Sequence, residues 1–357
     1  MVRPMWSFEL SGGKLAAMVR VVVTGAASVL GRRVVALLEG RDDVDEVVGL
    51  DLRSAPSTRP MDLLTGDLVG ALEGADAVLH LASVFGPAIE GPEIDDAVDV
   101  AVAKRLFDAA AQVGVGQVVV LSSATVYGPW ANNPVPLTEE APLRPHPDLA
   151  FAVQRAEVER LAWEARRSTP GLVVSCLRPA PVVDDGRGGW LAEALDAAAD
   201  VPAADDTAAQ YLHVADLASA VVAAWEHHVD GPLNVAPDGW LTPTQRRALD
   251  PVPRVRLPEP VALKVAAWRW RLRLAPVPPG VLPYARHPWV VANDRLAALG
   301  WTATSSNEEA YVVGHDASLL ESISPQRRQE LALGITAGVA AAAIAGAVAL
   351  ARRRRAR

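Results

Sequence analysis

The sequence predicts an α/β protein built on a Rossmann-type, doubly wound parallel sheet, with a smaller C-terminal substrate lobe and a C-terminal apolar helix. The first sign is the run 19–31, in which a valine-rich strand passes through a turn of small residues into a helical pattern. The second is another strand at 47–51, which ends in an acid, Asp51. Strand-like and helical runs then keep alternating, with a buried strand at 77–81, a helix at about 93–112 and a strand at 117–123. Such alternation favours parallel strands, right-handed crossovers and ligands bound beyond the carboxyl ends of the strands.

The turn between the first strand and the first helix is expected to bind a phosphate. Backbone N–H groups at a helix start have no intrahelical partner, and the helix dipole favours an anion there. Asp51 follows at a spacing that suits a hydrogen bond to an adenosine ribose hydroxyl. A carboxylate would repel a 2′-phosphate, so NAD is expected and NADP less so, although Arg53 leaves some room for NADP. In the alternative interpretation, Gly25 and Asp51 only form turns in an ordinary strand-helix-strand unit.

Composition limits the class of protein and its partners. The chain has 357 residues, of which 50% are hydrophobic, so it can bury a large core. Its formal net charge of −8 argues against nucleic acid as a partner and leaves a small molecule as the expected ligand. The lone cysteine, Cys176, lies in an apolar strand-like run and is expected to be a buried core thiol in a cytoplasmic domain.

Seven motifs at the expected strand ends occur in a characteristic order. They are TGAASVLG at 24–31, DL at 67–68, HLAS at 80–83, LSSATVYG at 121–128, LRPAPVV at 177–183, YLHVADLASAV at 211–221 and GPLNVA at 231–236. Over about residues 18–310, the chain resembles the extended short-chain dehydrogenase/reductase family, in its NAD-dependent epimerase/dehydratase branch.

The resemblance implies a set of cofactor-binding residues. The pyrophosphate would lie on Gly25, Ala27, Ser28, Val29, Leu30 and Gly31, the ribose on Asp51, the adenine on Asp67 and Leu68, and the nicotinamide side against Leu81, Ala82, Ser83, Arg155 and Pro179. Ser123 falls on the family's catalytic hydroxyl position, and no metal site is expected. Structural alternatives are a helix N-cap for Asp67, core histidines for His80 and His213, and packing for Tyr127.

The sequence departs from the family pattern in the helix FAVQRAEVERL. The family uses a tyrosine and, four residues later, a lysine whose charge lowers the phenol pKa for proton transfer. If Glu159 takes the place of the family glutamate, then Phe151 and Arg155 occupy those two positions. Phe151 has no ionisable proton, so a proton would have to come from His146, Tyr127 or the substrate. Ser28 also replaces a glycine that lets backbone approach the pyrophosphate.

Three functions fit these observations. The resemblance implies an NAD-dependent epimerase/dehydratase-like oxidoreductase acting on a sugar nucleotide or a related small molecule. The changed tyrosine and lysine positions instead suggest a catalytically silent NAD(P)-binding sensor or scaffold at a membrane. A third possibility is an enzyme that uses NAD with an unfamiliar acid/base.

An arginine-rich stretch marks the expected substrate lobe. Its basic side chains are Arg246, Arg247, Arg254, Arg256, Arg269, Arg271 and Arg273. The segment 260–274 fits a lobe helix packed on the core, a site in which arginines hold a substrate diphosphate, or a helix lying in a membrane surface.

The expected organisation of the chain has six parts. They are a flexible extension at 1–17 before a start at Met18, a dinucleotide-binding core at 18–180, a substrate lobe interleaved with core elements at 181–315, a linker at 316–330, a transmembrane helix at 331–350 and a basic tail at 351–357. The twenty uncharged residues at 331–350 could span a bilayer, although a soluble or partner-packed alanine helix is the alternative. Gly334 and Gly338 have the spacing of closely packed membrane helices, which suits a homodimer.

Overall fold

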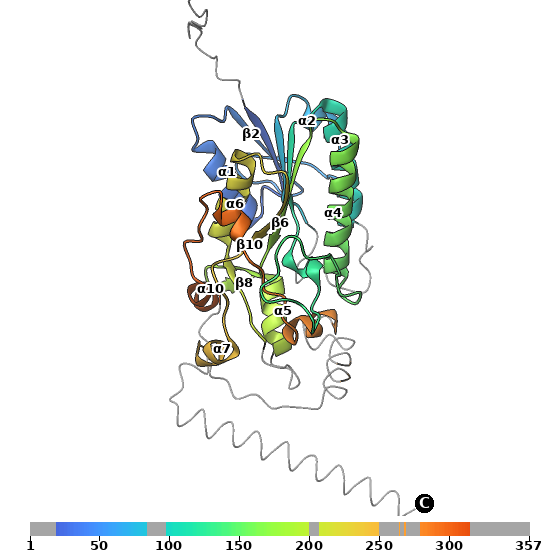
Figure 1. Ribbon diagram of the computed structural model, residues 1–357. Coiled ribbons are helices and arrows are strands. Elements are labelled where there is room, and N and C mark those ends of the chain that lie inside the picture. Colours follow the sequence, from blue (N-terminus) through green and yellow to red (C-terminus); the bar gives the residue numbers. More distant parts are fainter. Residues whose placement is uncertain are drawn as a thin grey trace, which may run out of the picture.

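The structure is a computed structural model that describes residues 19–83, 98–199, 207–249, 264, 268 and 279–314. Within them, seven strands form one sheet at the centre of the protein (Figure 1). Across the sheet the order is β10 (Gly231–Val235), β6 (Val173–Pro179), β5 (Gln117–Leu121), β4 (Ala77–His80), β1 (Arg20–Thr24), β2 (Glu46–Asp51) and β3 (Thr58–Pro60). Every neighbouring pair is parallel, which confirms the predicted Rossmann-type sheet. The chain runs from β1 to β2 and β3 on one side of β1 and then crosses to β4 on the other side. Ligands of such sheets bind at the point where the strand order reverses.

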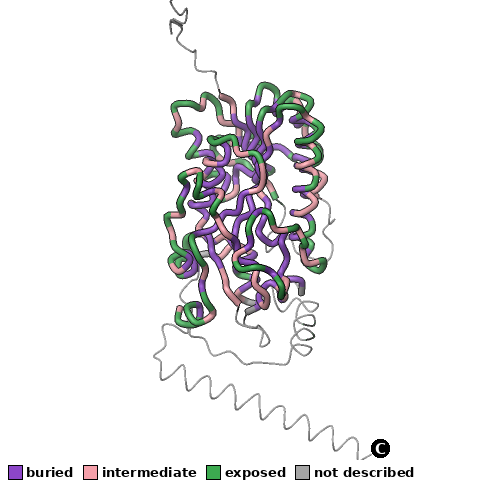
Figure 2. The backbone as a smooth tube through the Cα atoms, in the orientation of Figure 1, coloured by how far each residue is buried: buried purple, intermediate pink, exposed green. Residues whose placement is uncertain are grey.

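Helices cover both faces of the sheet (Figure 1). One layer contains α1 (Val29–Glu39) and α6 (Val214–Glu226), and the other contains α2 (Leu68–Leu72), α3 (Val98–Val113) and α4 (Ala150–Ser168). The side chains of β1 alternate between them, since Val21 and Val23 join the core under α1 and α6 while Val22 joins the core under α3 and α4. Figure 2 shows buried residues along the strands and exposed residues on the outer helix surfaces.

The smaller lobe is built around a second sheet. Its strands are β7 (Val182–Asp184), β8 (Arg187–Gly188) and β9 (Leu212–His213), in the order β8-β7-β9. Around them lie α5 (Trp190–Ala199), α7 (Pro243–Leu249), the 3-10 helix η2 (Pro279–Ala285) and α10 (Asn307–Gly314), whereas α9 (Asp294–Ala297) packs against β10 of the main sheet. The helix α6 and the strand β10 return from this half of the chain to the main sheet.

Sequence reasoning missed the edge strand β3, because it lies in a polar stretch with prolines. Pro60 is compatible with an edge strand, where one missing N–H donor does no harm. The predicted helix at 93–112 is described from Val98 to Val113. The lone thiol of Cys176 is buried in β6, as expected, and burial raises its pKa.

The predicted parts 1–17, 316–330, 331–350 and 351–357 lie outside the described residues. The C-terminal apolar helix and the Gly334 and Gly338 pair therefore stay predictions. None of the helices in the described ranges combines the length and the apolar character needed to cross a bilayer. Of the segment 260–274, only Lys264 and Trp268 are described, so its three interpretations also stay open.

A buried ion pair joins α4 to the sheet. Arg178 on β6 donates from Nε and Nη2 to the carboxylate of Glu159 on α4, over 3.0 Å and 2.6 Å. The Ser122 hydroxyl donates to the same carboxylate over 2.5 Å. Arg178 Nη1 donates to the Tyr127 hydroxyl, which donates to Asn234 Oδ1, each over 2.7 Å. The two charges are thus paired and hydrogen-bonded, which is the condition under which burial of an ion pair is tolerated.

Replacing Glu159 by Gln should leave the Arg178 charge buried without a counter-charge. We expect the free energy of unfolding to fall by about 3–5 kcal/mol, measured by urea denaturation. The control is Glu157→Gln on the same helix, where the carboxylate pairs with Arg160 at the surface and contributes about 0–1 kcal/mol. Equal losses in the two variants would contradict this role for the Arg178 pair.

The buried His80 should make stability depend on pH. Its imidazole is 2% exposed, and burial, with the nearby Arg155 charge, lowers its pKa from 6.5 to about 4. The unfolded chain therefore takes up a proton at a higher pH than the folded protein does. The free energy of unfolding should fall by up to about 3 kcal/mol as the pH drops from about 6.5 toward 4.

Urea denaturation over this pH range tests the His80 contribution. His80→Asn keeps a polar group that can reach Thr24 Oγ1, now 2.8 Å from the His80 Nδ1, but removes the titration. We expect a shallower pH dependence in His80→Asn and an unchanged one in His227→Asn, whose histidine is exposed. The same slope in all three proteins would rule out His80 as the source.

Candidate functional site

The turn after β1 has no room for a side chain at Gly25 or at Gly31. Gly25 has a φ of +74°, and a Cβ atom there would lie 2.8 Å from the backbone nitrogen of Ala82. A Cβ atom on Gly31 would lie 2.1 Å from the carbonyl oxygen of Gly25. These two glycines let the turn, the start of α1 and the loop after β4 pack against one another.

The N-terminus of α1 leaves donors for an anion. Ser28 caps the helix, and its hydroxyl accepts from the Gly31 N–H over 2.9 Å. No hydrogen bond within the described part of the chain uses the N–H of Val29 or Leu30. These are the groups at which a helix start binds phosphate, so the Ser28 cap leaves the first two N–H donors of the helix available.

Asp51 stands beside the turn, at the end of β2. Its Oδ2 accepts from the Ala27 N–H over 3.0 Å, and its Oδ1 accepts from the Arg53 N–H over 2.9 Å. The Arg53 guanidinium is mostly exposed and lies 3.5 Å from the same oxygen. The carboxylate is therefore fixed in place next to the predicted pyrophosphate site, as a ribose-binding acid must be.

The loop Leu81–Ser83 connects the turn to α4 through a second buried ion pair. The Ala82 N–H donates to Thr24 Oγ1 over 3.3 Å, and the Ser83 hydroxyl donates to Asp99 Oδ2 over 2.8 Å. Arg155 forms an ion pair with the same Asp99 carboxylate and also donates to the Ser83 hydroxyl over 2.6 Å. Its Nη1 donates to a backbone carbonyl, that of residue 121, over 3.0 Å. Arg155 is thus enclosed by protein groups, and its side chain is 3% exposed.

Sequence reasoning missed Asp99. The available signal was an acid on the otherwise apolar face of the helix 98–113, since a buried carboxylate needs a cation. Its partner lies 56 positions away, so local pattern could not identify it.

Phe151, which the resemblance aligns with the family tyrosine, packs near the start of α4. Its ring meets the Trp190 ring of α5 edge to face, with centroids 4.8 Å apart, and the Arg155 guanidinium lies 5.3 Å from its centroid. The side chain therefore joins α4 to the smaller lobe through apolar contact, and it supplies no proton at this position.

Ser123 lies at the carboxyl end of β5 and is buried. Its Oγ accepts from the Thr125 hydroxyl over 3.0 Å and caps the 3-10 helix η1 (Ala124–Tyr127). The Tyr127 hydroxyl is held by Arg178 and Asn234, and burial raises the pKa of Tyr127 to about 12. The packing interpretation of Tyr127 is therefore confirmed.

The other predicted residues divide into structural and site groups. Asp67 caps α2, since its Oδ1 accepts from the Gly70 N–H over 2.9 Å, and Leu68 is buried in the core. Asp67 is thus an N-cap, and the predicted adenine contact of Asp67 and Leu68 stays a prediction. Pro179 ends β6, so it lies with Ser123 at the carboxyl ends of two neighbouring parallel strands.

His213 is also structural, because its Nδ1 accepts from the Ala215 N–H and caps α6. Its Nε2 lies 3.3 Å from Asp185, and Arg33 pairs with Asp184 next to it. These three side chains lie close together, yet both carboxylates pair with Arg33. Because the His213 Nδ1 accepts a hydrogen bond, the proton of the neutral imidazole is on Nε2, where a metal would have to bind. The arrangement does not suit a cation.

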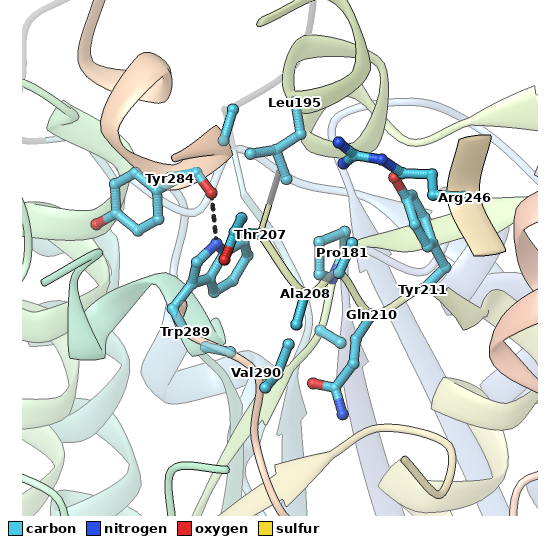
Figure 3. Close-up of a pocket in the computed structure, with 14 residues that line it drawn as sticks. Pro181, Leu195, Thr207, Ala208, Gln210, Tyr211, Arg246, Tyr284, Trp289 and Val290 are labelled. Carbon is cyan, nitrogen blue, oxygen red and sulfur yellow. Dashed lines mark hydrogen bonds between the residues drawn. The ribbon is translucent and has the colours of Figure 1, made fainter. Parts of the chain in front are cut away.

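A pocket of about 430 Å³ opens beside these strand ends (Figure 3). Ala124, next to Ser123, and Ala180 and Pro181, next to Pro179, form its wall on the Rossmann side. The remaining lining comes from the smaller lobe: Leu195, residues 207–211, Arg246, Tyr284, Ala285, Trp289 and Val290. The pocket therefore adjoins the predicted nicotinamide position and lies between the main sheet and the smaller lobe.

Solved structures confirm the fold. The chain is similar to UDP-glucose 4-epimerase of Thermus thermophilus in complex with NAD, with a TM-score of 0.61, 22% identity, and coverage of 83% of this chain and 97% of that one. It is also similar to a short-chain dehydrogenase/reductase superfamily protein of Agrobacterium tumefaciens with bound NAD, with a TM-score of 0.60, 23% identity, and coverage of 89% and 99%.

Sequence comparisons place the same features in a family. A 3-diazoavenalumate denitrifying reductase from a Streptomyces species is 29% identical over 311 residues, which is 80% of this chain and 96% of the relative. The model of the NAD dependent epimerase/dehydratase family matches residues 21–236, more than half of the chain and all the way from β1 to β10. With the glycine turn, Asp51 and the sheet order all inside that match, the chain belongs to the NAD-dependent epimerase/dehydratase family.

Proposed function

We propose that this protein is an NAD(H)-dependent oxidoreductase whose substrate accepts or gives up a hydride without a proton from residue 151. The observation that carries the proposal is the contrast between the two halves of the site. The glycine turn, Asp51 and the adjoining pocket have the form of a working cofactor and substrate site, whereas Phe151 and Arg155 are held by Trp190 and Asp99.

The residues present fit NAD. Gly25 and Gly31 leave backbone alone at the closest approach, and the N–H groups of Val29 and Leu30 would hold the pyrophosphate. The fixed Asp51 carboxylate would accept from a ribose hydroxyl and would repel the extra phosphate of NADP. When bound, NAD(H) would supply hydride chemistry at the mouth of the pocket.

The protein groups around the pocket offer little acid or base chemistry. The Tyr284 hydroxyl donates to the Thr125 carbonyl over 2.8 Å, and burial raises its pKa. The Tyr127 hydroxyl is engaged elsewhere, and the His146 ring stacks on Trp130. Ser123 can orient a polar group of the substrate but is a weak acid. The lack of an available acid or base favours a substrate with an electron-poor hydride acceptor. It disfavours an alcohol substrate, whose hydroxyl must lose a proton as the hydride leaves.

The Streptomyces relative supports a reductase. Its name describes a reduction with loss of nitrogen from a diazo compound, and the match spans almost its whole length. The sugar nucleotide expected from the resemblance would need a base for its hydroxyl group, which Phe151 cannot be.

Cofactor binding is the first test. By isothermal titration calorimetry, NADH should bind at least about tenfold more tightly than NADPH, because Asp51 favours a free ribose hydroxyl. Asp51→Asn keeps an oxygen acceptor but removes the charge, so it should weaken NADH binding and narrow the difference. Asp43→Asn is the matched control, since it removes one charge at an exposed site.

Hydride transfer is then followed with NADH carrying deuterium at the transferable position. Incubated with a small-molecule cell extract, the unaltered protein should place deuterium in a discrete product detected by mass spectrometry, and Asp51→Asn should do so more slowly at limiting NADH. Tight NADH binding with no labelled product, in this extract or with UDP-glucose, would instead identify a silent NAD-binding sensor.

We also propose that residues 331–350 and the basic tail attach the cytoplasmic enzyme to a membrane. The proposal rests on sequence alone: an uncharged run of twenty residues followed by five arginines. Full-length protein should sediment with membranes, and a variant ending at Gln329 should not. Full-length protein found wholly in the supernatant would end this proposal.

A further inference from the structure

The pocket beside the predicted nicotinamide position contains one unusual group, the Arg246 side chain. Arg246 lies on α7 and is 6% exposed, and Figure 3 shows its side chain passing the hydroxyl end of Tyr211 with the guanidinium pointing toward Leu195. In the described ranges no carboxylate forms an ion pair with it, and its Nε has no hydrogen-bond partner. Burial of an unpaired guanidinium is costly, so this position favours an anionic ligand.

The neighbouring polar groups already have partners. The Gln210 amide donates to the carbonyls of Gly239 and Val291, over 2.8 Å and 2.9 Å, and accepts from the Val291 N–H over 2.8 Å. The Tyr211 hydroxyl donates to Asp196 over 2.7 Å. Among the described lining residues, Arg246 and the Thr207 hydroxyl therefore have hydrogen-bonding capacity left for a ligand, and of these two Arg246 alone carries a charge.

The walls of the pocket are flat and apolar. The Tyr284 and Trp289 rings stand perpendicular with centroids 5.3 Å apart, and the Trp289 indole N–H donates to the Tyr284 carbonyl over 2.8 Å (Figure 3). Leu195, Pro181 and Val290 complete the apolar surface. Such walls bind a planar hydrocarbon or aromatic body better than a hydroxyl-rich sugar, whose polar groups would lose their water.

We propose that this pocket binds a small substrate with a planar apolar body and a single carboxylate, which Arg246 holds through its guanidinium. The apolar body would extend toward Ala124 and Ala180, where hydride chemistry would take place. This inference rests on the proposed function, because the pocket is the substrate site of that reaction. One buried guanidinium balances one carboxylate, whereas a nucleotide diphosphate carries at least two negative charges.

The test compares two probes of the same shape that differ in charge, cinnamate and cinnamide. Their binding to the full chain is measured by isothermal titration calorimetry, with and without NADH, and UDP-glucose is titrated in parallel. Arg246→Met removes the charge at nearly constant length, Arg246→Lys keeps the charge without the planar fork, and Arg247→Met is the matched control at the next, exposed position.

Cinnamate should bind the unaltered protein at least about tenfold more tightly than cinnamide, because a charge-assisted hydrogen bond to carboxylate is lost in the amide. Arg246→Met should lose that preference, Arg246→Lys should retain part of it, and Arg247→Met should retain all of it. Equal binding of the two probes to the unaltered protein would overturn the proposal, and that comparison needs no variant to fold. Tighter binding of UDP-glucose than of cinnamate, lost in Arg246→Met, would overturn it in favour of a diphosphate.

The NADH titration separates this inference from the proposed function. Cinnamate bound through Arg246 by a protein that fails to bind NADH would refute the oxidoreductase and leave the carboxylate site standing. NADH binding with no preference for cinnamate would refute the carboxylate site alone.

Discussion

The buried pair of Arg178 and Glu159 determines where the two halves of the site lie. It fixes α4 against β6, and through Tyr127 and Asn234 it also holds the loop after β5 and the strand β10. Helix α4 carries Phe151 and Arg155, and the loop after β5 carries Ser123. The residues that would face the nicotinamide are thus positioned by one fully buried electrostatic network, whose loss would affect packing and chemistry together.

The residues proposed to bind the cofactor and the residues at the family's acid/base positions differ in character. On the cofactor side, backbone donors and a fixed carboxylate surround the turn at 25–31. On the proton side, an aromatic ring packs against Trp190, and a guanidinium is neutralised by Asp99. Hydride transfer depends on placing the cofactor near the substrate, whereas acid/base catalysis depends on a titratable group at the same point. In the function proposed above, the chain has the arrangement needed for the first and lacks a titratable side chain at residue 151 for the second.

The sheet and the cofactor turn could be predicted because they depend on local patterns. Apolar strand runs, the turn glycines and Asp51 occur within short stretches of sequence, and the ordered motifs support one another. The Asp99 partner of Arg155 could not be predicted, since it depends on two helices packing side by side. The pocket around Arg246 is formed by segments that are distant in the sequence, so its lining could not be predicted. The arginine-rich stretch indicated only that an anion could bind in this part of the chain. Asp67 shows a different difficulty: its position allowed two interpretations, and the N-cap geometry confirms the structural one while the adenine contact stays a prediction.

The close contact between Gly25 and Ala82 has an evolutionary consequence. A side chain at Gly25 would push on the loop that carries Ser83, and through it on the Asp99 and Arg155 pair. Selection for a stably folded protein would therefore retain this glycine even in a descendant that had stopped using a dinucleotide. In related proteins, the unused N–H groups at the start of the first helix and an acid at the position of Asp51 therefore indicate continued cofactor binding better than the glycine does.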